Sequence, residues 1–304
     1  MQSIINFIRW KNLLMIALVQ CLIKYALLQP FGVNMSLSNF EFMLLVIATI
    51  CIAAAGNIIN DIYDVETDFI NKPKQIIIGK TITEKKAYNL FIVFNVLGVG
   101  LGFFVSNSIG KSELFSIFVI ISILLYLYAS FLKQTFLIGN IIVSALVAFS
   151  IIIVGIFELI PAMTAQNQAI QLTFFKILLD YALFAFILNF LREIAKDIED
   201  IDGDYKTGMH TLPIVIGRER ASNVLFWLSL IPLLIIIYYI NTSLYKQPIA
   251  VGYFLVFIIG PLIFTSIKLF SSKTKKDFHN ISNLFKLVMF FGMLSILLYP
   301  IIIH

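Results

Sequence analysis

The chain has 304 residues, of which 60% are hydrophobic, and its mean hydropathy is +0.96. Only 13% of the residues are charged, and the formal net charge is +5. A soluble domain of this size does not carry so much apolar surface, so the composition excludes a soluble protein and indicates a membrane protein. The basic residues are dispersed among the predicted loops, and we therefore expect no nucleic-acid partner.

Nine apolar segments approach the roughly 20 residues that a helix needs to cross a bilayer. We predict spans at 13–31, 39–59, 87–108, 113–131, 137–157, 173–191, 221–240, 247–270 and 283–303. The predicted fold is therefore all-α, a polytopic membrane protein with nine transmembrane helices in a single domain over residues 1–304. The start of the first segment lacks a small-residue cleavage pattern, so we expect it to stay as a span.

The basic residues predict the orientation of these spans. With the N-terminus in the cytoplasm, the loops on that side carry 18 Lys and Arg residues, and the opposite loops carry only Lys111 and Lys246. Cytoplasmic loops are enriched in Lys and Arg. We expect a protein of the cell (inner) membrane, with its N-terminus in the cytoplasm and its C-terminus outside.

An acid-rich segment follows the second predicted span. Asn60, Asp64 and Asp68 are spaced i, i+4 and i+8, which places them on one face of a helix, and Asn57 precedes them by one turn. Such a face of oxygen ligands suits Mg²⁺. The alternative is a helix end whose acids only face water, which accounts for Glu66 but not for the two amides.

Lysines follow this acidic segment at positions 72 and 74. They could form surface ion pairs of little energetic value, or they could hold phosphate oxygens that a metal ion leaves free. The positive charge of cytoplasmic loops explains them equally well, so both readings stay open.

A second acid-rich segment follows the sixth predicted span. Glu193, Asp197, Asp200 and Asp204 form one helical stripe, and Arg192 lies near it. Gly203 and Gly208 predict a helix end or turn. The functional reading is a second set of Mg²⁺ ligands that faces the first, and the alternative is a charged amphipathic linker. The predicted topology places both segments on the cytoplasmic side.

The two acidic segments suggest an internal repeat. Asp64 and Asp200 are 136 positions apart, as are Asp68 and Asp204. This spacing predicts two related four-helix halves plus a ninth helix around a central cavity, with a site between the halves. Coincidence in a chain of biased composition is the alternative.

Two Mg²⁺ sites at a bilayer surface suit a substrate with a diphosphate head and an apolar tail, such as an allylic prenyl diphosphate. Metal ions would make the diphosphate a better leaving group, and a nucleophile would then attack the carbocation-like carbon. Tyr128 is a candidate to face that carbon, and Asn12 could line a pocket or bridge helices. Cys21 and Cys51 lie inside spans and suggest no disulfide.

These segments resemble the two signatures of the UbiA superfamily of intramembrane prenyltransferases. The first reads Asn60-Asp61-x-x-Asp64-x-x-x-Asp68 with Asn71-Lys72-Pro73, and the second reads Asp197-x-x-Asp200-x-x-x-Asp204 with Thr211-Leu212-Pro213. The resemblance extends to Tyr128-x-x-x-Leu132-Lys133, to Gly139-Asn140 and to nine spans over the whole chain. It implies a Mg²⁺-dependent prenyltransferase, whose partners are a prenyl diphosphate, a hydrophobic acceptor and membrane lipid, with no obligatory protein partner.

The resemblance also assigns roles to individual residues. It implies that Lys133 contacts the diphosphate and that Asp197 is an additional motif acid. The metal and diphosphate ligands that it implies are Asn60, Asp64, Asp68, Asp200 and Asp204. Gln75 departs from the family, which often has an Arg at this position, and either Lys72 or Lys74 could take the place of that Arg.

The segment 192–204 with 211–217 is most similar to the digeranylgeranylglyceryl phosphate synthase branch of the superfamily. That resemblance implies transfer of a geranylgeranyl group to a prenylated glycerol phosphate. The quinone, tocopherol and chlorophyll branches share parts of the segment, so an aromatic acceptor or heme stays open.

The sequence fits two other classes of membrane protein less well. A cation transporter or channel would need polar residues that continue across the bilayer, toward Asp180 and Lys24, whereas the acids concentrate at one face. A CDP-alcohol phosphotransferase would carry Asp-Gly-x-x-Ala-Arg, but Asp202-Gly203 is followed by Asp204-Tyr205-Lys206-Thr207.

Overall fold

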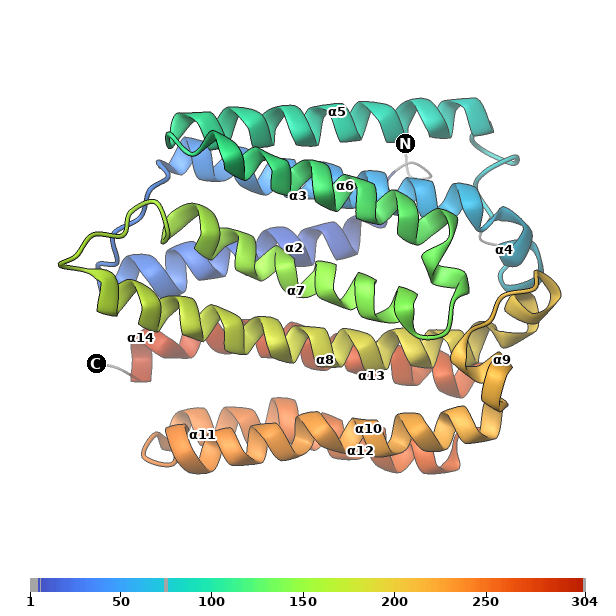
Figure 1. Ribbon diagram of the computed structural model, residues 1–304. Helices are drawn as coiled ribbons and strands as arrows, with labels where there is room; N and C mark the ends of the chain where they lie inside the picture. Colours follow the sequence, from blue (N-terminus) through green and yellow to red (C-terminus); the bar gives the residue numbers. More distant parts are fainter. Residues whose placement is uncertain (1–4, 6, 74–75, 303–304) are drawn as a thin grey trace.

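The protein is a bundle of long, roughly aligned helices (Figure 1). The computed structural model describes residues 5, 7–73 and 76–302. The helices are α2 (Trp10–Leu22), α3 (Asn39–Tyr63), α4 (Val65–Asn71), α5 (Glu84–Ser108), α6 (Phe115–Ser130), α7 (Ile138–Glu158), α8 (Gln168–Lys206), α9 (Leu212–Ile216), α10 (Arg218–Tyr239), α11 (Pro248–Phe254), α12 (Gly260–Ser271), α13 (Lys275–Leu294) and α14 (Tyr299–Ile302). The described residues include no β-strand, which confirms the predicted all-α class.

Nine helical segments in the described ranges are long and apolar enough to cross a membrane, as predicted. Five of them include turns of wider or tighter helix: α2 extends to Phe31, α10 to Leu244 and α13 to Leu298, α11 joins α12, and the segment of α6 begins at Ser112. Local capping explains where several helices begin. Ser38 and Glu41 cap the start of α3 reciprocally, and Thr274 and Asp277 do the same for α13.

The helices divide into an inner and an outer set. The apolar part of α3 is 56% buried and that of α7 is 50% buried, whereas α5 and α6 reach only 22% and 11%. In Figure 1 α5 lies along one edge of the bundle, and α10 and α12 lie along the other. The outer helices expose large apolar side chains such as Val96, Trp227 and Ile267. Such a surface is compatible with lipid, so the protein is an integral multi-pass membrane protein.

The short helices α4 and α9 lie at one end of the bundle, and α14 lies at the other (Figure 1). Helix α8 passes from end to end. Its 39 residues measure about 58 Å at 1.5 Å per residue, which exceeds the roughly 30 Å of a hydrocarbon core. The part of α8 near α4 and α9 therefore extends beyond the apolar layer, and it carries the second acidic segment.

The far end of the bundle holds a buried ion pair. The Nζ of Lys24 lies 2.7 Å from Oε1 of Glu158, and both side chains are almost fully buried. Lys24 also donates to the backbone oxygen of Leu37 at 2.8 Å, and the nitrogen of Leu37 donates to Glu158 at 3.0 Å. These bonds satisfy two charges that would otherwise be costly inside a membrane. The sequence singled out Lys24 but not its partner.

Candidate active site

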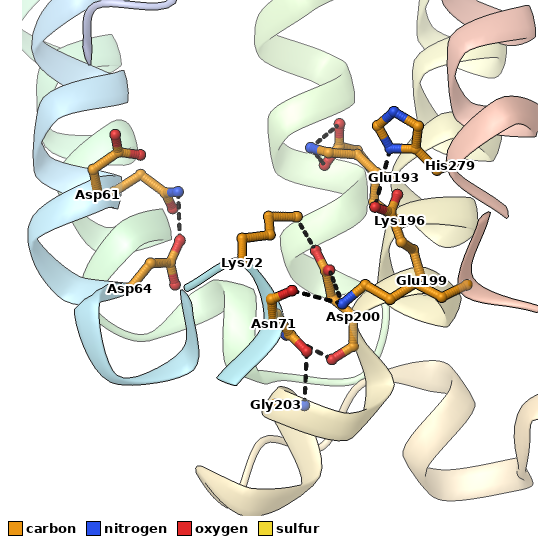
Figure 2. A network of polar contacts seen from close by, with 12 residues as sticks. Asp61, Asp64, Asn71, Lys72, Glu193, Lys196, Glu199, Asp200, Gly203 and His279 are labelled. Atoms are coloured by element: carbon orange, nitrogen blue, oxygen red, sulfur yellow. Dashed lines mark hydrogen bonds and ion pairs between the residues drawn. The ribbon is translucent and has the colours of Figure 1, made fainter. Parts of the chain in front are cut away.

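The two acidic segments meet at the end of the bundle that carries α4 and α9. Helix α4 packs against α8, and the two segments come to lie side by side although about 130 residues separate them. Figure 2 shows side chains from both segments reaching toward one another, with Lys72 and Asn71 directed at Asp200. The sequence prediction that both segments lie at one face of the bundle therefore agrees with the structure.

The first segment forms a compact cluster around Asp64. Asn60 donates to Oδ2 of Asp64 at 2.6 Å, and the Nζ of Lys133 lies 2.5 Å from Oδ1 of the same carboxylate. Lys133 also donates to Oδ1 of Asn60 at 3.4 Å. It comes from the turn Leu132–Gln134 between α6 and α7. One lysine thus joins the two motif residues that the sequence placed on one helical face.

The prediction of one continuous helix through Asp68 is wrong in one respect. Helix α3 ends at Tyr63, and Asp64, with φ −92° and ψ 0°, lies between it and α4. Asp64 thus caps both helices, and α4 carries Asp68. Helix α4 runs in a different direction from α3 (Figure 1) and packs against α8.

The second segment lies on α8. The amide of Asn140 donates to Oδ2 of Asp197 at 2.7 Å, and Lys72 lies 2.5 Å from Oδ2 of Asp200. Asp204 is buried. Gly203 does not end the helix as predicted, because α8 continues to Lys206. The turn follows at Gly208, whose φ of +74° favours glycine, as the sequence indicated.

The electrostatics of the cluster favour a cation. Burial, with the neighbouring charge of Asp64, raises the pKa of Asp68 to about 6. Burial disfavours the charged form of Lys72, but Asp200 and Glu199 outweigh it, so the pKa of Lys72 is raised. Carboxylates that burial and like charges destabilise gain most from additional positive charge.

Other predicted site residues have local partners. The amide of Asn57 donates to the backbone oxygen of Ile8 at 3.0 Å, and Oδ1 of Asn12 accepts from Lys286 at 2.6 Å. Arg192 pairs with Glu193 at 2.9 Å. Tyr128 is close enough to Asp64, Asp197 and Glu193 to interact electrostatically with all three. Lys74 and Gln75 lie outside the described residues.

Three residues at this site were not predicted. Arg9 lies 2.6 Å from Oδ1 of Asp61, in the left-handed conformation that is uncommon for a residue other than glycine. Lys275 donates to the backbone oxygen of Asn71 at 2.9 Å. His279 contacts Glu199 at 3.1 Å. The only signal in the sequence was their place in polar segments next to spans, which does not single them out.

The donor set fits Mg²⁺. All the candidate ligands are oxygens, and Oδ1 of Asp200 is buried and accepts no hydrogen bond from a described residue. A cavity of about 20 Å³ lies against Asp61 and Asp68, which is room for roughly one water-sized group. Among the described residues, no three His, Cys, Asp or Glu side chains lie close enough together to enclose an ion. Mg²⁺ usually takes one or two carboxylates, with waters and substrate phosphate completing its shell.

Curated relatives resemble this chain over most of its length. A digeranylgeranylglyceryl phosphate synthase of Methanosphaera stadtmanae is 30% identical, over 84% of this chain and 87% of its own. The protein of the same name from Methanococcoides burtonii is 32% identical, over 97% of this chain and 98% of its own.

Solved structures resemble the fold. A structure of digeranylgeranylglyceryl phosphate synthase has a TM-score of 0.65 at 23% identity and covers 99% of this chain and 98% of its own. A UbiA homologue from Archaeoglobus fulgidus, bound to DMAPP and Mg²⁺, has a TM-score of 0.58 at 18% identity and covers 97% of this chain and 99% of its own. The model of the UbiA prenyltransferase family matches residues 17–301. The chain therefore belongs to the UbiA prenyltransferase family, a family of membrane enzymes.

Proposed function

We propose that this protein transfers a geranylgeranyl group from geranylgeranyl diphosphate to geranylgeranylglyceryl phosphate, with Mg²⁺ as cofactor. The observation that carries the proposal is the meeting of the two acidic segments, with Asp64 and Asp200 each paired to a lysine at 2.5 Å. The names of the curated relatives support this choice of acceptor. An aromatic acceptor is the alternative that the experiment below distinguishes.

The acidic residues and lysines have distinct tasks in this proposal. Bound Mg²⁺ would neutralise the diphosphate and improve it as a leaving group. The ligands would be Asn60, Asp64 and Asp68 on one side, and Asp197, Asp200 and Asp204 on the other. Lys133 and Lys72 (or Lys74) would donate hydrogen bonds to the remaining diphosphate oxygens, since ammonium groups bind phosphate oxygens strongly. Asn57, Asn12, Arg192 and Tyr128 would line the substrate cavity.

The reaction breaks the allylic C–O bond and forms a C–O bond to the acceptor. The diphosphate leaves with the bonding electron pair, and a hydroxyl oxygen of the acceptor attacks the allylic carbon and gives up its proton to the released diphosphate or to water. Fixed charges at the place where charge develops give the largest stabilisation in a site that excludes water. The Lys133 side chain is only 8% exposed, which favours such an arrangement.

The orientation is also part of the proposal. We place the end with α4 and α9 in the cytoplasm of a cell-membrane protein, because the basic residues concentrate there. The transporter alternative is disfavoured by the far end of the bundle, where Lys24 and Glu158 are paired to each other and to Leu37.

The proposal is tested with labelled geranylgeranyl diphosphate and purified protein in lipid. The acceptors are geranylgeranylglyceryl phosphate, dihydroxynaphthoate, homogentisate and heme. We expect a labelled product with geranylgeranylglyceryl phosphate only, and its loss in Asp64→Ala and in Asp200→Ala. The variants Glu66→Gln and Asp202→Asn are the matched controls. A product with an aromatic acceptor alone would show that geranylgeranylglyceryl phosphate is not the acceptor. Activity in both alanine variants would show that Asp64 and Asp200 do not form the metal site.

A further inference from the structure

We propose that Asn71 is a positioning residue that fixes the separation of the two acidic segments, by binding the backbone of α8 where Gly203 leaves room. This inference rests on the proposed function, because it concerns how the two sets of metal and diphosphate ligands are held. Asn71 belongs to the first signature quoted above, but neither the sequence pattern nor the resemblance assigned it a role of its own.

The side chain of Asn71 binds α8 through both ends of its amide. Its Nδ2 donates to the backbone oxygen of Asp200 at 2.8 Å, and its Oδ1 accepts from the backbone nitrogen of Gly203 at 3.0 Å. Asn71 is 8% exposed; its bond from Gly203 is buried and its bond to Asp200 is partly buried. Figure 2 shows this amide between the two backbone groups. An uncharged amide supplies a donor and an acceptor together, which a carboxylate, an ammonium group or an apolar side chain cannot do.

Gly203 is the necessary counterpart of Asn71. A Cβ atom on Gly203 would lie 2.3 Å from Nδ2 of Asn71 and 2.6 Å from its Cγ. These distances are too short for any contact, so a larger residue at 203 would displace the amide. This explains why a glycine is tolerated inside α8, where it destabilises a helix by roughly 1 kcal/mol relative to alanine. Asn71 and Gly203 therefore form one joint, which we call the Asn71–Gly203 joint.

The joint acts directly on the candidate ligands. Asn71 is the last residue of α4, about one turn after Asp68, and Lys72 follows it. On the other side, the joint holds the backbone of Asp200, whose carboxylate meets Lys72. Lys275 of α13 donates to the backbone oxygen of Asn71 at 2.9 Å, so a third helix is tied to the same point. A shift at the joint would therefore move Asp68 and Lys72 relative to Asp200.

Besides the Lys72–Asp200 ion pair, a weaker polar contact joins α4 to Thr207, the residue after α8. The hydroxyl of Thr67 donates to that of Thr207 at 3.3 Å. It uses one neutral hydrogen bond near the upper limit of length, whereas Asn71 uses two shorter ones. Thr67→Val therefore serves as a control that removes a contact between α4 and α8 but keeps the joint.

The first test measures the separation of the helices without substrate or metal. Spin labels are attached to the variants Phe69→Cys in α4 and Tyr205→Cys in α8. The native side chains at these positions are 67% and 73% exposed. The two native cysteines, Cys21 and Cys51, are replaced by alanine. Pulsed electron paramagnetic resonance should give one narrow distance distribution in the parent and in Thr67→Val. We expect a broader or shifted distribution in Asn71→Ala and in Gly203→Ala.

The controls separate the joint from general effects of substitution. Gly100→Ala changes a helical glycine whose added Cβ would meet nothing within 4 Å. Asn107→Ala removes an exposed amide that bonds within its own helix. Both should keep the parental distribution. Asn71→Asp keeps the size and the acceptor but loses the donor toward the oxygen of Asp200, so it should behave like Asn71→Ala. A parental distribution in Asn71→Asp would overturn the proposal, because shape alone would then suffice.

The second test is a double-mutant cycle on Asn71 and Gly203 that measures the Mg²⁺ dependence of diphosphate binding. The Mg²⁺ concentration that half-saturates binding of labelled geranylgeranyl diphosphate should rise about 10- to 100-fold in Asn71→Ala, the range for residues that orient metal ligands. Gly203→Ala should give a similar rise, and the double variant should be no worse than the more severe single one, because both disrupt one contact. Unchanged Mg²⁺ dependence in Asn71→Ala, or fully additive effects, would contradict the joint. If the parent binds no prenyl diphosphate, the proposed function fails, and the distance measurement still decides the joint.

Discussion

Lys72 and Asp200 lie 128 positions apart in the chain, yet the Nζ of the lysine is 2.5 Å from Oδ2 of the carboxylate. Lys133 and Asp64 repeat this relationship at the same distance. Each acidic segment thus has a lysine 2.5 Å from a carboxylate that we assign to the metal and diphosphate site, and Asp200 has a second, Lys275, at 3.8 Å. The Lys133 side chain is 8% exposed and that of Lys72 is 27% exposed.

This difference in burial predicts the order of two variants. Hydrogen bonds to charged groups contribute about 1.5–3 kcal/mol, and more where solvent is excluded. Lys133→Ala should therefore weaken binding of geranylgeranyl diphosphate by roughly 10- to 100-fold, and Lys72→Ala by less. Equilibrium binding of the labelled diphosphate at saturating Mg²⁺ measures both. Lys111 is exposed and lies at the other end of the bundle, so Lys111→Ala should not change diphosphate binding. A larger loss of binding in Lys72→Ala than in Lys133→Ala would contradict the predicted order.

The titration of Asp68 predicts how Mg²⁺ binding depends on pH. Its pKa of about 6 lies above the ordinary 3.8, so the folded protein holds this proton more tightly than the unfolded chain. The stability that the protonated carboxyl contributes is complete below pH 3.8 and is lost as the pH rises through 6. Protons compete with Mg²⁺ for the carboxylate, so the half-saturating Mg²⁺ concentration should rise as the pH falls below 6.

The control for this pH profile is Asp68→Asn. This variant should bind Mg²⁺ more weakly at pH 7.5, and the inflection near pH 6 should disappear. Titrations of labelled diphosphate binding between pH 5 and 8 provide the measurement. An inflection that persists unchanged in the variant would assign the titration to another group.

The buried pair of Lys24 and Glu158 predicts an effect on stability without an effect on the reaction. Lys24→Met leaves the Glu158 carboxylate buried without its counter-charge, which costs about 3–5 kcal/mol. Thermal unfolding in detergent should show a clearly lowered midpoint. The double variant Lys24→Met with Glu158→Gln should recover most of it, because the amide can still bond the backbone of Leu37. Prenyl transfer per folded molecule should be unchanged, since the pair lies at the opposite end from the acidic segments.

The contact between Arg9 and Asp61 predicts an effect on the start of the chain. Arg9→Ala removes the 2.6 Å ion pair between Arg9, which directly precedes α2, and Asp61 of α3. Limited proteolysis should then cleave before Trp10 faster than in the parent, whereas Lys11→Ala should not change the rate. Equal rates in Arg9→Ala and the parent would show that the packing of Phe7, which is fully buried, is sufficient.

The sequence predicted the spans well because the apolar core of the bilayer requires each spanning helix to carry about 20 mostly apolar residues. Each of the nine predicted spans overlaps one helical segment of the described residues, and residue 303, the end of the ninth prediction, lies outside them. The sixth span was predicted at 173–191, and the spacing of the second acidic segment predicted helix as far as Asp204; α8 runs from Gln168 to Lys206. Its charged continuation packs on α4 and α13. Hydropathy carries no signal for such tertiary contacts.

The site was predicted in part. Spacing correctly grouped Asn60 with Asp64, since residues four apart share a helix face. It could not predict the change of direction at Asp64, which depends on where α4 packs. Pairings such as Lys24 with Glu158, or Asn71 with Gly203, join residues more than 130 positions apart. A single sequence does not show which distant residues come into contact, so these pairings could be identified only from the folded structure.

The central claim is that the two acidic segments together hold a prenyl diphosphate through Mg²⁺. The most direct measurement is equilibrium binding of labelled geranylgeranyl diphosphate to the parent, Asp64→Asn and Asp200→Asn, with Mg²⁺ and with excess chelator. The claim predicts saturable binding in the parent that chelator abolishes, and at least tenfold weaker binding in each variant, since each removes a ligand from a different segment. Binding that survives the chelator, or that is unchanged in either variant, would contradict it.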